Sequence, residues 1–395
     1  MEPATGPSRP GAGRQCAAVA AAAALLVLAC QWLSVRYNYQ GNWTALFLTG
    51  SKIGVPPGKE FAGTYVHARS YGYDGQFYRL IAHDPAFRRG LARHIDNPRL
   101  RCQRILVPGL AYTVALGRAG WIDGAYVTVI LGFVLLGTYW TARWVAAHGW
   151  PAAWGLVFLT LPATMVSATR MTVDVALAAL ACAWALYATR GELSPKAYAV
   201  LAALPLAREA GLLFNLASAA QACFERRVRR AAAVALTVIP AALWFAFLTR
   251  HTQPDPTNWL VRLPLAGLVR SLASGPHEGA GGLIRVALIA LHYAALAGVL
   301  LGIALAVRMW LARPRGSFEV AALAFALLAI QLGNSDIWSE VIGFGRVFSP
   351  LLLLLALAAL ARRKMLLAAP LALTLPRMLA ELVSPALGVV RGMLG

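Results

Sequence analysis

The chain has 395 residues, of which 59% are hydrophobic and only 13% charged, and its formal net charge at pH 7 is +20. Soluble domains carry about 25% charged residues, so this composition excludes an ordinary soluble protein. The basic residues stand in short clusters between apolar runs, which is the positive-inside pattern of membrane topology. The sequence therefore predicts an all-α, polytopic membrane protein. No nucleic-acid partner is predicted, because no extended basic domain is present.

Ten apolar runs follow one another along the chain, several with the roughly 20 residues that cross the hydrocarbon core of a bilayer. The first follows Arg9 and Arg14, and we interpret it as a retained signal anchor, with a cleavable signal peptide as the alternative. Residues 1–15 are predicted to be a disordered cytoplasmic tail and 16–395 a single transmembrane domain. The runs lie at about 16–35, 121–142, 151–169, 173–189, 197–224, 231–249, 284–307, 318–333, 347–361 and 365–380.

A further apolar segment, Ile105–Gly117, decides the topology of everything after it. It contains a proline and two glycines and is short of a spanning helix. We interpret it as an interfacial or re-entrant helix, which gives about 10–11 transmembrane helices. Residues 36–120 are then a long first extracytoplasmic loop with interfacial helices.

The basic clusters support this choice. With the N-terminus in the cytoplasm, every short basic loop is cytoplasmic if 198–224 is a tight pair of helices broken near Pro205–Arg208. The alternative, in which Ile105–Gly117 crosses the membrane, moves Arg143, Arg190 and Lys196 to the outside. The positive-inside rule therefore favours the first topology.

The first outer loop carries an unusually polar stretch, "YGYDGQFYRLIAHDP" (Tyr71–Pro85). Asp74 stands between glycines at a position typical of a helix N-cap. The apolar residues Phe77, Leu80 and Ile81 recur at helical spacing, which predicts a short amphipathic helix on the membrane surface. Asp74, at its exposed start, is either only a cap or a reactive carboxylate.

Other polar residues interrupt apolar sequence further on. Arg101, Gln103 and Arg104 precede the segment at 105–117, where arginines either extend to lipid headgroups or bind a phosphate. Charges at membrane depth cost roughly 2.5–3.5 kcal/mol, so they usually pair or serve a function. Those found within or beside the later runs are Arg170 with Asp174, Arg208 with Glu209, and Glu340 with Arg346.

The favoured topology places these charges on one side of the membrane. Carboxylates and arginines gathered at one face suit a reaction on a lipid-linked phosphate. A carboxylate takes a proton from an acceptor hydroxyl, and arginine stabilises the departing phosphate. Simple structural ion pairing is the alternative for each of these groups.

Several segments resemble the C-type glycosyltransferase fold of polytopic membrane enzymes, most closely bacterial membrane proteins of cell-surface glycopolymer formation. The first-loop motif is the specific part of this resemblance, and the later segments follow in the expected order. The segments concerned are Tyr73–Tyr78, Ile81–Pro85, Asp96–Pro98, Gln103–Pro108, Thr172–Asp174, Arg208–Glu209 and Gly343–Leu354.

The resemblance implies a membrane glycosyltransferase that uses a polyprenyl-phosphate sugar and a glycan or lipid acceptor, with inversion at the anomeric carbon. The implied location is the bacterial inner membrane, with the active site facing the periplasm. No cofactor is predicted, because the first loop lacks a paired acidic motif and the five cysteines form no CxxC. The resemblance implies Asp74 and Asp174 as catalytic residues. The predicted substrate-binding residues are Gln76, Tyr78, Arg101, Gln103, Arg104, Arg208, Glu209, Glu340 and Arg346.

Two other functions remain open at this point. A transporter or flippase for a lipid-linked saccharide would also need intramembrane arginines, but spread through the depth of the bilayer. A non-catalytic subunit of a glycopolymer assembly complex would not need Asp74. Charges on one face favour the enzyme.

Overall fold

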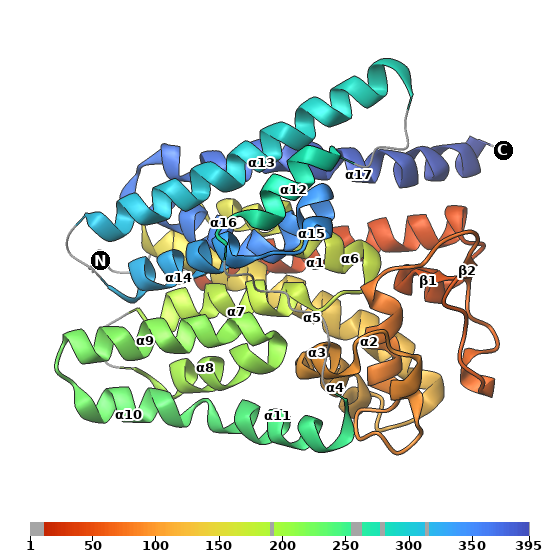
Figure 1. Cartoon of the computed structure of the whole chain (residues 1–395), viewed down its shortest axis with the longest axis horizontal. Helices are drawn as coiled ribbons and strands as arrows, with labels where there is room; N and C mark the ends of the chain where they lie inside the picture. The colour runs from red at the N-terminus through yellow and green to blue at the C-terminus, as the bar shows by residue number, and fades with distance from the viewer. Residues whose placement is uncertain (1–11, 190–192, 254–262, 277–280, 313–315, 395) are drawn as a thin grey trace.

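A computed structural model describes residues 12–189, 193–253, 263–276, 281–312 and 316–394 (Figure 1). The described chain is helical except for two very short parallel strands, β1 (Thr49–Gly50) and β2 (Val66–His67), so the all-α prediction is confirmed. Of the predicted N-terminal tail, residues 1–11 lie outside the described residues. Residues 12–15 already belong to helix α1 (Ala12–Asn38), so the helix begins earlier than predicted.

Six helices among the described residues are long and apolar enough to cross a membrane, or seven if one bent pair forms a single span. The bent pair is η4 (Ala152–Thr160) and α6 (Pro162–Arg170), which meet at 65° beside Pro162. This arrangement fits a multi-pass membrane protein. The six are α1, α5 (Ala119–Ala147), α10–α11 (Val228–His251), α13 (Gly282–Leu311), α16 (Val341–Arg362) and η6–α17 (Met365–Leu394).

Three of the predicted apolar runs, at 173–189, 197–224 and 318–333, form helices that are shorter than a full span requires. The run at 197–224 is divided into α8 (Pro195–Ala207) and α9 (Leu212–Phe224) by the single turn η5 (Glu209–Gly211), so the predicted break near Pro205–Arg208 is confirmed. The segment after residue 104 forms α4 (Leu106–Val114), whose nine residues are too few to span a bilayer. The remaining elements outside the first loop are α7 (Asp174–Tyr187), α12 (Ala266–Ser274), α14 (Ser317–Gln331) and α15 (Ser335–Ser339).

Helices α7 and α16 form the centre of the molecule. Every residue of α7 from Asp174 to Leu186 is buried, and so is the leucine run of α16 at 351–355. Six alanines give α7 a narrow surface, so neighbouring helices approach it closely on all sides. A helix that is apolar all round belongs inside a bundle or a membrane. The first residue of this buried helix, Asp174, is consequently a polar group that needs a partner.

The first loop folds into a compact unit at one end of the helices (Figure 1). Its central helix α2 (Asp74–His83) is buried from Gly75 to His83. The prediction that this helix lies on the membrane surface is therefore wrong, because protein covers its polar residues as well as its apolar ones. The surrounding elements are η1 (Trp43–Phe47), β1, η2 (Lys59–Phe61), β2, η3 (Leu91–His94), α3 (Pro98–Gln103) and α4.

The basic clusters gather at the other end of the helices. Arg362 pairs with Glu319 at the start of α14. The backbone N–H of Ser317 donates to Gln221, close to the basic cluster "ERRVRR" (Glu225–Arg230). Arg363 lies over the ring of Trp150, just after the end of α5. If Ile105–Gly117 crossed the membrane, the end of α5 would lie on the opposite side from the other basic loops. The contact between Arg363 and Trp150 does not fit that topology. Arg190 lies outside the described residues.

Substituting Gly75 by Ala is expected to destabilise the fold by about 1–3 kcal/mol, the usual cost of overpacking. A Cβ at this position would overlap the backbone carbonyl oxygen of Arg170, where α2 meets the end of α6. Neither backbone can move freely. The check is the midpoint of thermal unfolding of the detergent-solubilised protein.

The matched control is Gly132→Ala in α5, where an added Cβ meets nothing within 4 Å. Alanine stabilises an open helical position by roughly 0.5–1 kcal/mol relative to glycine, so this variant should unfold at the same or a higher temperature. Equal loss of stability in both variants would contradict the close contact at Gly75.

Candidate active site

The chain enters α2 through a turn that glycine makes possible. Gly72 has φ +76°, and Tyr73 is extended, so that α2 begins at Asp74. Tyr73 rather than Asp74 is the N-cap residue, which corrects the predicted cap. Asp74 lies in the first turn, where the positive end of the helix dipole favours a carboxylate. Its side chain is therefore free of the capping role and can contact other elements.

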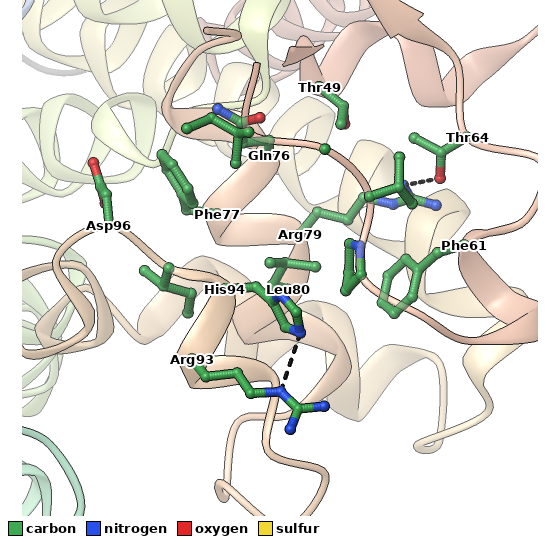
Figure 2. A pocket seen from close by; sticks show the side chains of 15 residues that line it. Thr49, Phe61, Thr64, Gln76, Phe77, Arg79, Leu80, Arg93, His94 and Asp96 are labelled. Atoms are coloured by element: carbon green, nitrogen blue, oxygen red, sulfur yellow. Dashed lines mark hydrogen bonds between the residues drawn. The ribbon is translucent and has the colours of Figure 1, made fainter. Parts of the chain in front are cut away.

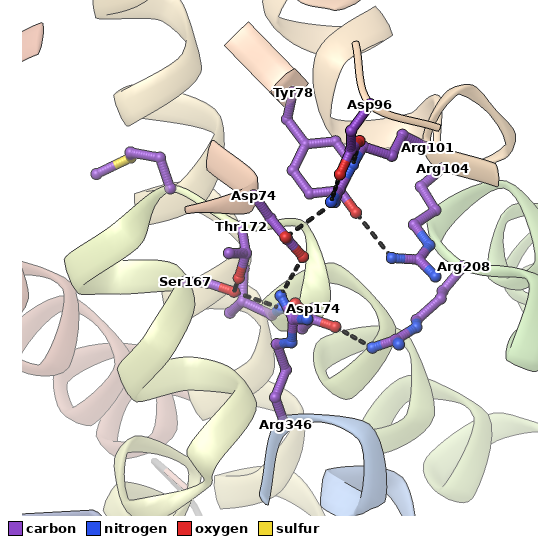
Figure 3. A network of polar contacts seen from close by, with 12 residues as sticks. Asp74, Tyr78, Asp96, Arg101, Arg104, Ser167, Thr172, Asp174, Arg208 and Arg346 are labelled. Carbon is purple, nitrogen blue, oxygen red and sulfur yellow. Dashed lines mark hydrogen bonds and ion pairs between the residues drawn. The ribbon is translucent and has the colours of Figure 1, made fainter. Parts of the chain in front are cut away.

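Both carboxylate oxygens of Asp74 are bound by arginines (Figure 3). The Nη1 atom of Arg101 in α3 lies 2.9 Å from Oδ1, and the Nη1 atom of Arg346 in α16 lies 2.5 Å from Oδ2. The Asp74 side chain is 15% exposed, so it is mostly buried but still accessible to solvent. Arg101 and Arg346, which are 27 and 272 residues away along the chain, thus converge on one carboxylate.

Asp174 forms a second centre of the network. It is 3% exposed and is paired with Arg208, which stands where α8 ends, while the Nε atom of Arg346 lies 3.7 Å from its Oδ2. The sequence suggested Arg170 as a partner of Asp174 one helical turn away. The structure breaks the helix between them at Met171, which has φ +49°, and Arg170 pairs instead with Glu381 at 3.2 Å.

A third centre joins the first loop to the break between α8 and α9. Arg104 binds Glu209 through two parallel hydrogen bonds of 2.8 and 2.7 Å, and its Nη1 donates to the hydroxyl of Tyr78 at 2.8 Å. The Nε atom of Arg208 lies 3.5 Å from the same Glu209 carboxylate. Bidentate pairs of this kind hold the guanidinium plane in one orientation.

The electrostatics of the network keep its carboxylates charged. Burial by itself would raise the pKa of Asp74, but the guanidinium groups of Arg346 and Arg101 outweigh burial and hold it well below its ordinary range. Burial likewise opposes ionisation of Glu209, and Arg104 and Arg208 lower the pKa of Glu209 to about 2. Both groups are therefore anions at neutral pH.

These two carboxylates should consequently lose their contribution to stability in acid. Because folding lowers the pKa of Asp74 and Glu209, their contribution is complete above their ordinary values of about 4 and is lost as the pH falls through the folded-state values. We expect a constant unfolding midpoint from pH 8 to pH 5 and a decline below about pH 4.

The variant Glu209→Gln provides the control for this pH series. It should be less stable at pH 7, because Arg104 loses a charged partner, and should show a shallower decline in acid. A decline of the wild-type midpoint already between pH 8 and pH 6 would contradict the assignment to these carboxylates.

Three predicted site residues stand apart from the network. The Gln76 carboxamide accepts from the N–H of Gly50 at 3.1 Å and donates to the carbonyl of Tyr71 at 2.9 Å, so it holds the loop against α2. Gln103 is half-buried and Glu340 is exposed at the end of α15. Within the described chain, neither has a side-chain hydrogen bond to the network.

The structure also adds residues that sequence reasoning missed. Asp96 binds Arg101 through both carboxylate oxygens, and so gives that arginine a second acidic partner. The ring of Tyr73 contacts two guanidinium groups, with the Cζ of Arg346 5.2 Å and that of Arg170 4.8 Å from its centroid. Both residues occur inside the quoted motifs, but only spatial proximity distinguishes them from their neighbours.

A separate ion pair fixes α2 to the long helix α5. Arg79 donates to both oxygens of Asp123 at 2.8 and 2.7 Å, and Nε2 of His83 lies 3.3 Å from the same carboxylate. At the end of α2, the Asp84 carboxylate accepts three backbone N–H groups from the following loop. These contacts position α2 and take no part in the Asp74 network.

The arrangement is an alternating set of carboxylates and guanidinium groups that can accept a proton and bind an anion side by side. In the described part of the chain, no three His, Cys, Asp or Glu residues are grouped so as to hold a metal ion. Comparisons with protein families, with curated proteins and with solved structures found no match.

Proposed function

We propose that this protein is a membrane glycosyltransferase that moves a sugar from a polyprenyl-phosphate donor to a glycan or lipid acceptor of the cell envelope. The observation that carries the proposal is Asp74, sheltered at the end of an apolar helix bundle and bound by Arg101 and Arg346. A base and two anion-binding groups within hydrogen-bond distance are the components that such a transfer needs.

In the proposed reaction the Asp74 carboxylate takes the proton of the acceptor hydroxyl. The hydroxyl oxygen forms a bond to the anomeric carbon, and the bond from that carbon to the phosphate oxygen breaks with its electron pair on the phosphate. The guanidinium of Arg346 stabilises the phosphate as it leaves. Attack from the face opposite the phosphate inverts the anomeric configuration.

The two arginines also explain how the base becomes active. While both guanidinium groups bind Asp74, its carboxylate is a weak base, because its pKa is held low. A donor phosphate that accepts hydrogen bonds from Arg346 would withdraw this arginine from Asp74. One carboxylate oxygen would then be free to accept a proton, and the substrate would itself increase the basicity of the group.

Asp174 has a different role in this proposal from the catalytic one implied by the resemblance. It is 3% exposed and bound to Arg208, so an acceptor hydroxyl has little access to it. Its charge orients Arg208 and Arg346 instead. Arg104, Glu209 and Tyr78 hold the neighbouring segment in the same way.

A cavity of about 220 Å³ beside Tyr73 supports a lipid-linked donor. Its walls come mainly from α6, α17 and the first loop. Met165, Val166 and Leu382 give them apolar parts, while Arg170 and Glu381 supply charge. An apolar chain could lie against the apolar parts of this cavity with its phosphate near Arg170 and Arg346, the two arginines that contact the Tyr73 ring.

The proposed location is the bacterial inner membrane, with the Asp74 network on the periplasmic side. Support comes from the basic clusters, which gather at the opposite end of the helices, as expected for the cytoplasmic side. The proposed count of about 10–11 membrane segments includes α7, α8, α9 and α14 as partial spans packed among the six long helices.

The test uses the full chain, purified and placed in liposomes with polyprenyl-phosphate hexoses and pentoses and a panel of saccharide acceptors. A glycosyltransferase releases free polyprenyl phosphate and forms a glycosidic product. A flippase leaves the donor intact and moves it between leaflets, and a non-catalytic subunit does neither. Absence of release with every donor, from folded protein, would refute the proposal.

A further inference from the structure

A second cavity, of about 280 Å³, lies beside α2 between the loop that follows β1 and the residues of η3 (Figure 2). It belongs wholly to the compact first-loop unit, away from the long apolar helices. Its volume is near the lower end of the roughly 300–1,000 Å³ typical of small-molecule sites. Such a volume suits the end unit of a larger molecule.

Most of the charges around this cavity are paired with an opposite charge. Arg79 contributes its guanidinium to the wall, but Asp123 neutralises it through two hydrogen bonds. Asp96 lines the cavity as well, and Arg101 is its partner. Arg93 is exposed and donates from Nε to Nε2 of His94 at 3.2 Å. The near-neutral balance is unlike a phosphate site, where several cations face one ligand.

The lining combines two kinds of surface. The rings of Phe61 and Phe77 provide flat apolar walls, while Thr49, His94 and Asp96 add hydroxyl, imidazole and carboxylate groups to the lining (Figure 2). Because Nε2 of His94 accepts from Arg93, its other ring nitrogen carries the proton and is a donor. A sugar ring has apolar C–H faces and hydroxyl edges, and so matches such a lining.

The cavity is connected to Asp74 by one residue. Asp96 lines the cavity and binds Arg101, and Arg101 binds Asp74. Phe77 is a second link, since its ring lies 4.5 Å from the Cζ of Arg101. A ligand that binds Asp96 would therefore compete with Arg101 for this carboxylate. Arg101 also binds the proposed base, Asp74, so the contacts of Asp74 would change as well.

We propose that this cavity binds a saccharide unit of the acceptor, and that the Asp96–Arg101 pair links its occupation to Asp74. The proposal rests on the transferase function proposed above and adds the place and chemical class of the acceptor. The lipid-linked donor and the neutral acceptor then approach Asp74 by separate routes, the donor through the cavity beside Tyr73 and the acceptor through this one.

The experiment measures binding of free mono- and disaccharides to the full detergent-solubilised chain by saturation-transfer NMR. Wild-type protein should give signals from at least one saccharide, and His94→Ala and Asp96→Asn should weaken its binding about tenfold to hundredfold, the effect of losing one strong hydrogen bond. The matched control is His251→Ala, because His251 is exposed on α11 and outside the cavity. It should bind like wild type.

The transfer assay adds a second readout. In His94→Ala the KM for the acceptor should rise about tenfold or more, and kcat should fall much less. No saccharide signal from folded wild-type protein, or equal binding by wild type and both cavity variants, would overturn the inference. Variant-sensitive saccharide binding without any release of polyprenyl phosphate would support the binding site while refuting the transferase function, so the two failures are distinguishable.

Discussion

Replacing Asp74 by Asn should lower sugar transfer by about 10²–10⁴-fold, the usual contribution of a general base. The carboxamide has the same shape, and its oxygen can still accept a hydrogen bond from one of the two arginines. It cannot take a proton from an acceptor hydroxyl. The measurements are the rate of polyprenyl-phosphate release in liposomes and the amount of surface glycan in cells that lack the native protein.

The matched control is Asp336→Asn in the first turn of α15, an exposed carboxylate outside the network. This variant should keep the wild-type rate. A normal rate from well-expressed Asp74→Asn protein would remove Asp74 from the chemistry. The ion pairs at Asp74 would then be structural, as they are between Arg79 and Asp123.

Replacing Asp174 by Ala should cost about 3–5 kcal/mol of unfolding free energy, the range for removing one partner of a buried ion pair. Arg208 would be left 8% exposed without its main counter-ion. The Glu209 carboxylate, 3.5 Å from Arg208, would still partly balance its charge. The loss of unfolding free energy should therefore lie toward the lower end of this range. Unfolding in mixed detergent and SDS micelles, followed by circular dichroism, measures the difference.

A double variant separates the charge from the packing. Asp174→Ala combined with Arg208→Met removes both members of the pair and should be more stable than Asp174→Ala alone, because no uncompensated charge remains buried. If the double variant loses the sum of the two single losses, the pair does not act as a unit and this interpretation of Asp174 is wrong.

The helical segments could be predicted from local sequence because their causes are local. Apolar residues in long runs specify buried or membrane helices, and a proline followed by charged residues specifies the break between α8 and α9. The proline and two glycines of Ile105–Gly117 likewise predicted that α4 would be short. The environment of α2 could not be predicted from local sequence, since an amphipathic pattern does not tell whether lipid, water or protein covers the polar face.

The membership of the candidate site was largely predictable, whereas its pairings were not. Membrane sidedness, argued from the basic loops, placed Asp74, Asp174 and Arg346 on one face, and the structure brings them within one network. Proximity in sequence suggested Arg170 for Asp174, and this was wrong, because the turn at Met171 separates them. Glu340 shared the predicted side, but in the described chain it is exposed and its side chain forms no hydrogen bond or ion pair with the network.

The amino-acid sequence alone determines that this chain is an all-α protein with several helices suited to a membrane, because hydrophobicity and helix termination depend on neighbouring residues. Only the tertiary structure decides which arginine binds which carboxylate. Arg346 and Asp74 are 272 residues apart, and their contact depends on how α16 packs against the start of α2. Ion pairs act over a few ångströms, so their partners are set by packing between distant segments rather than by spacing along the chain.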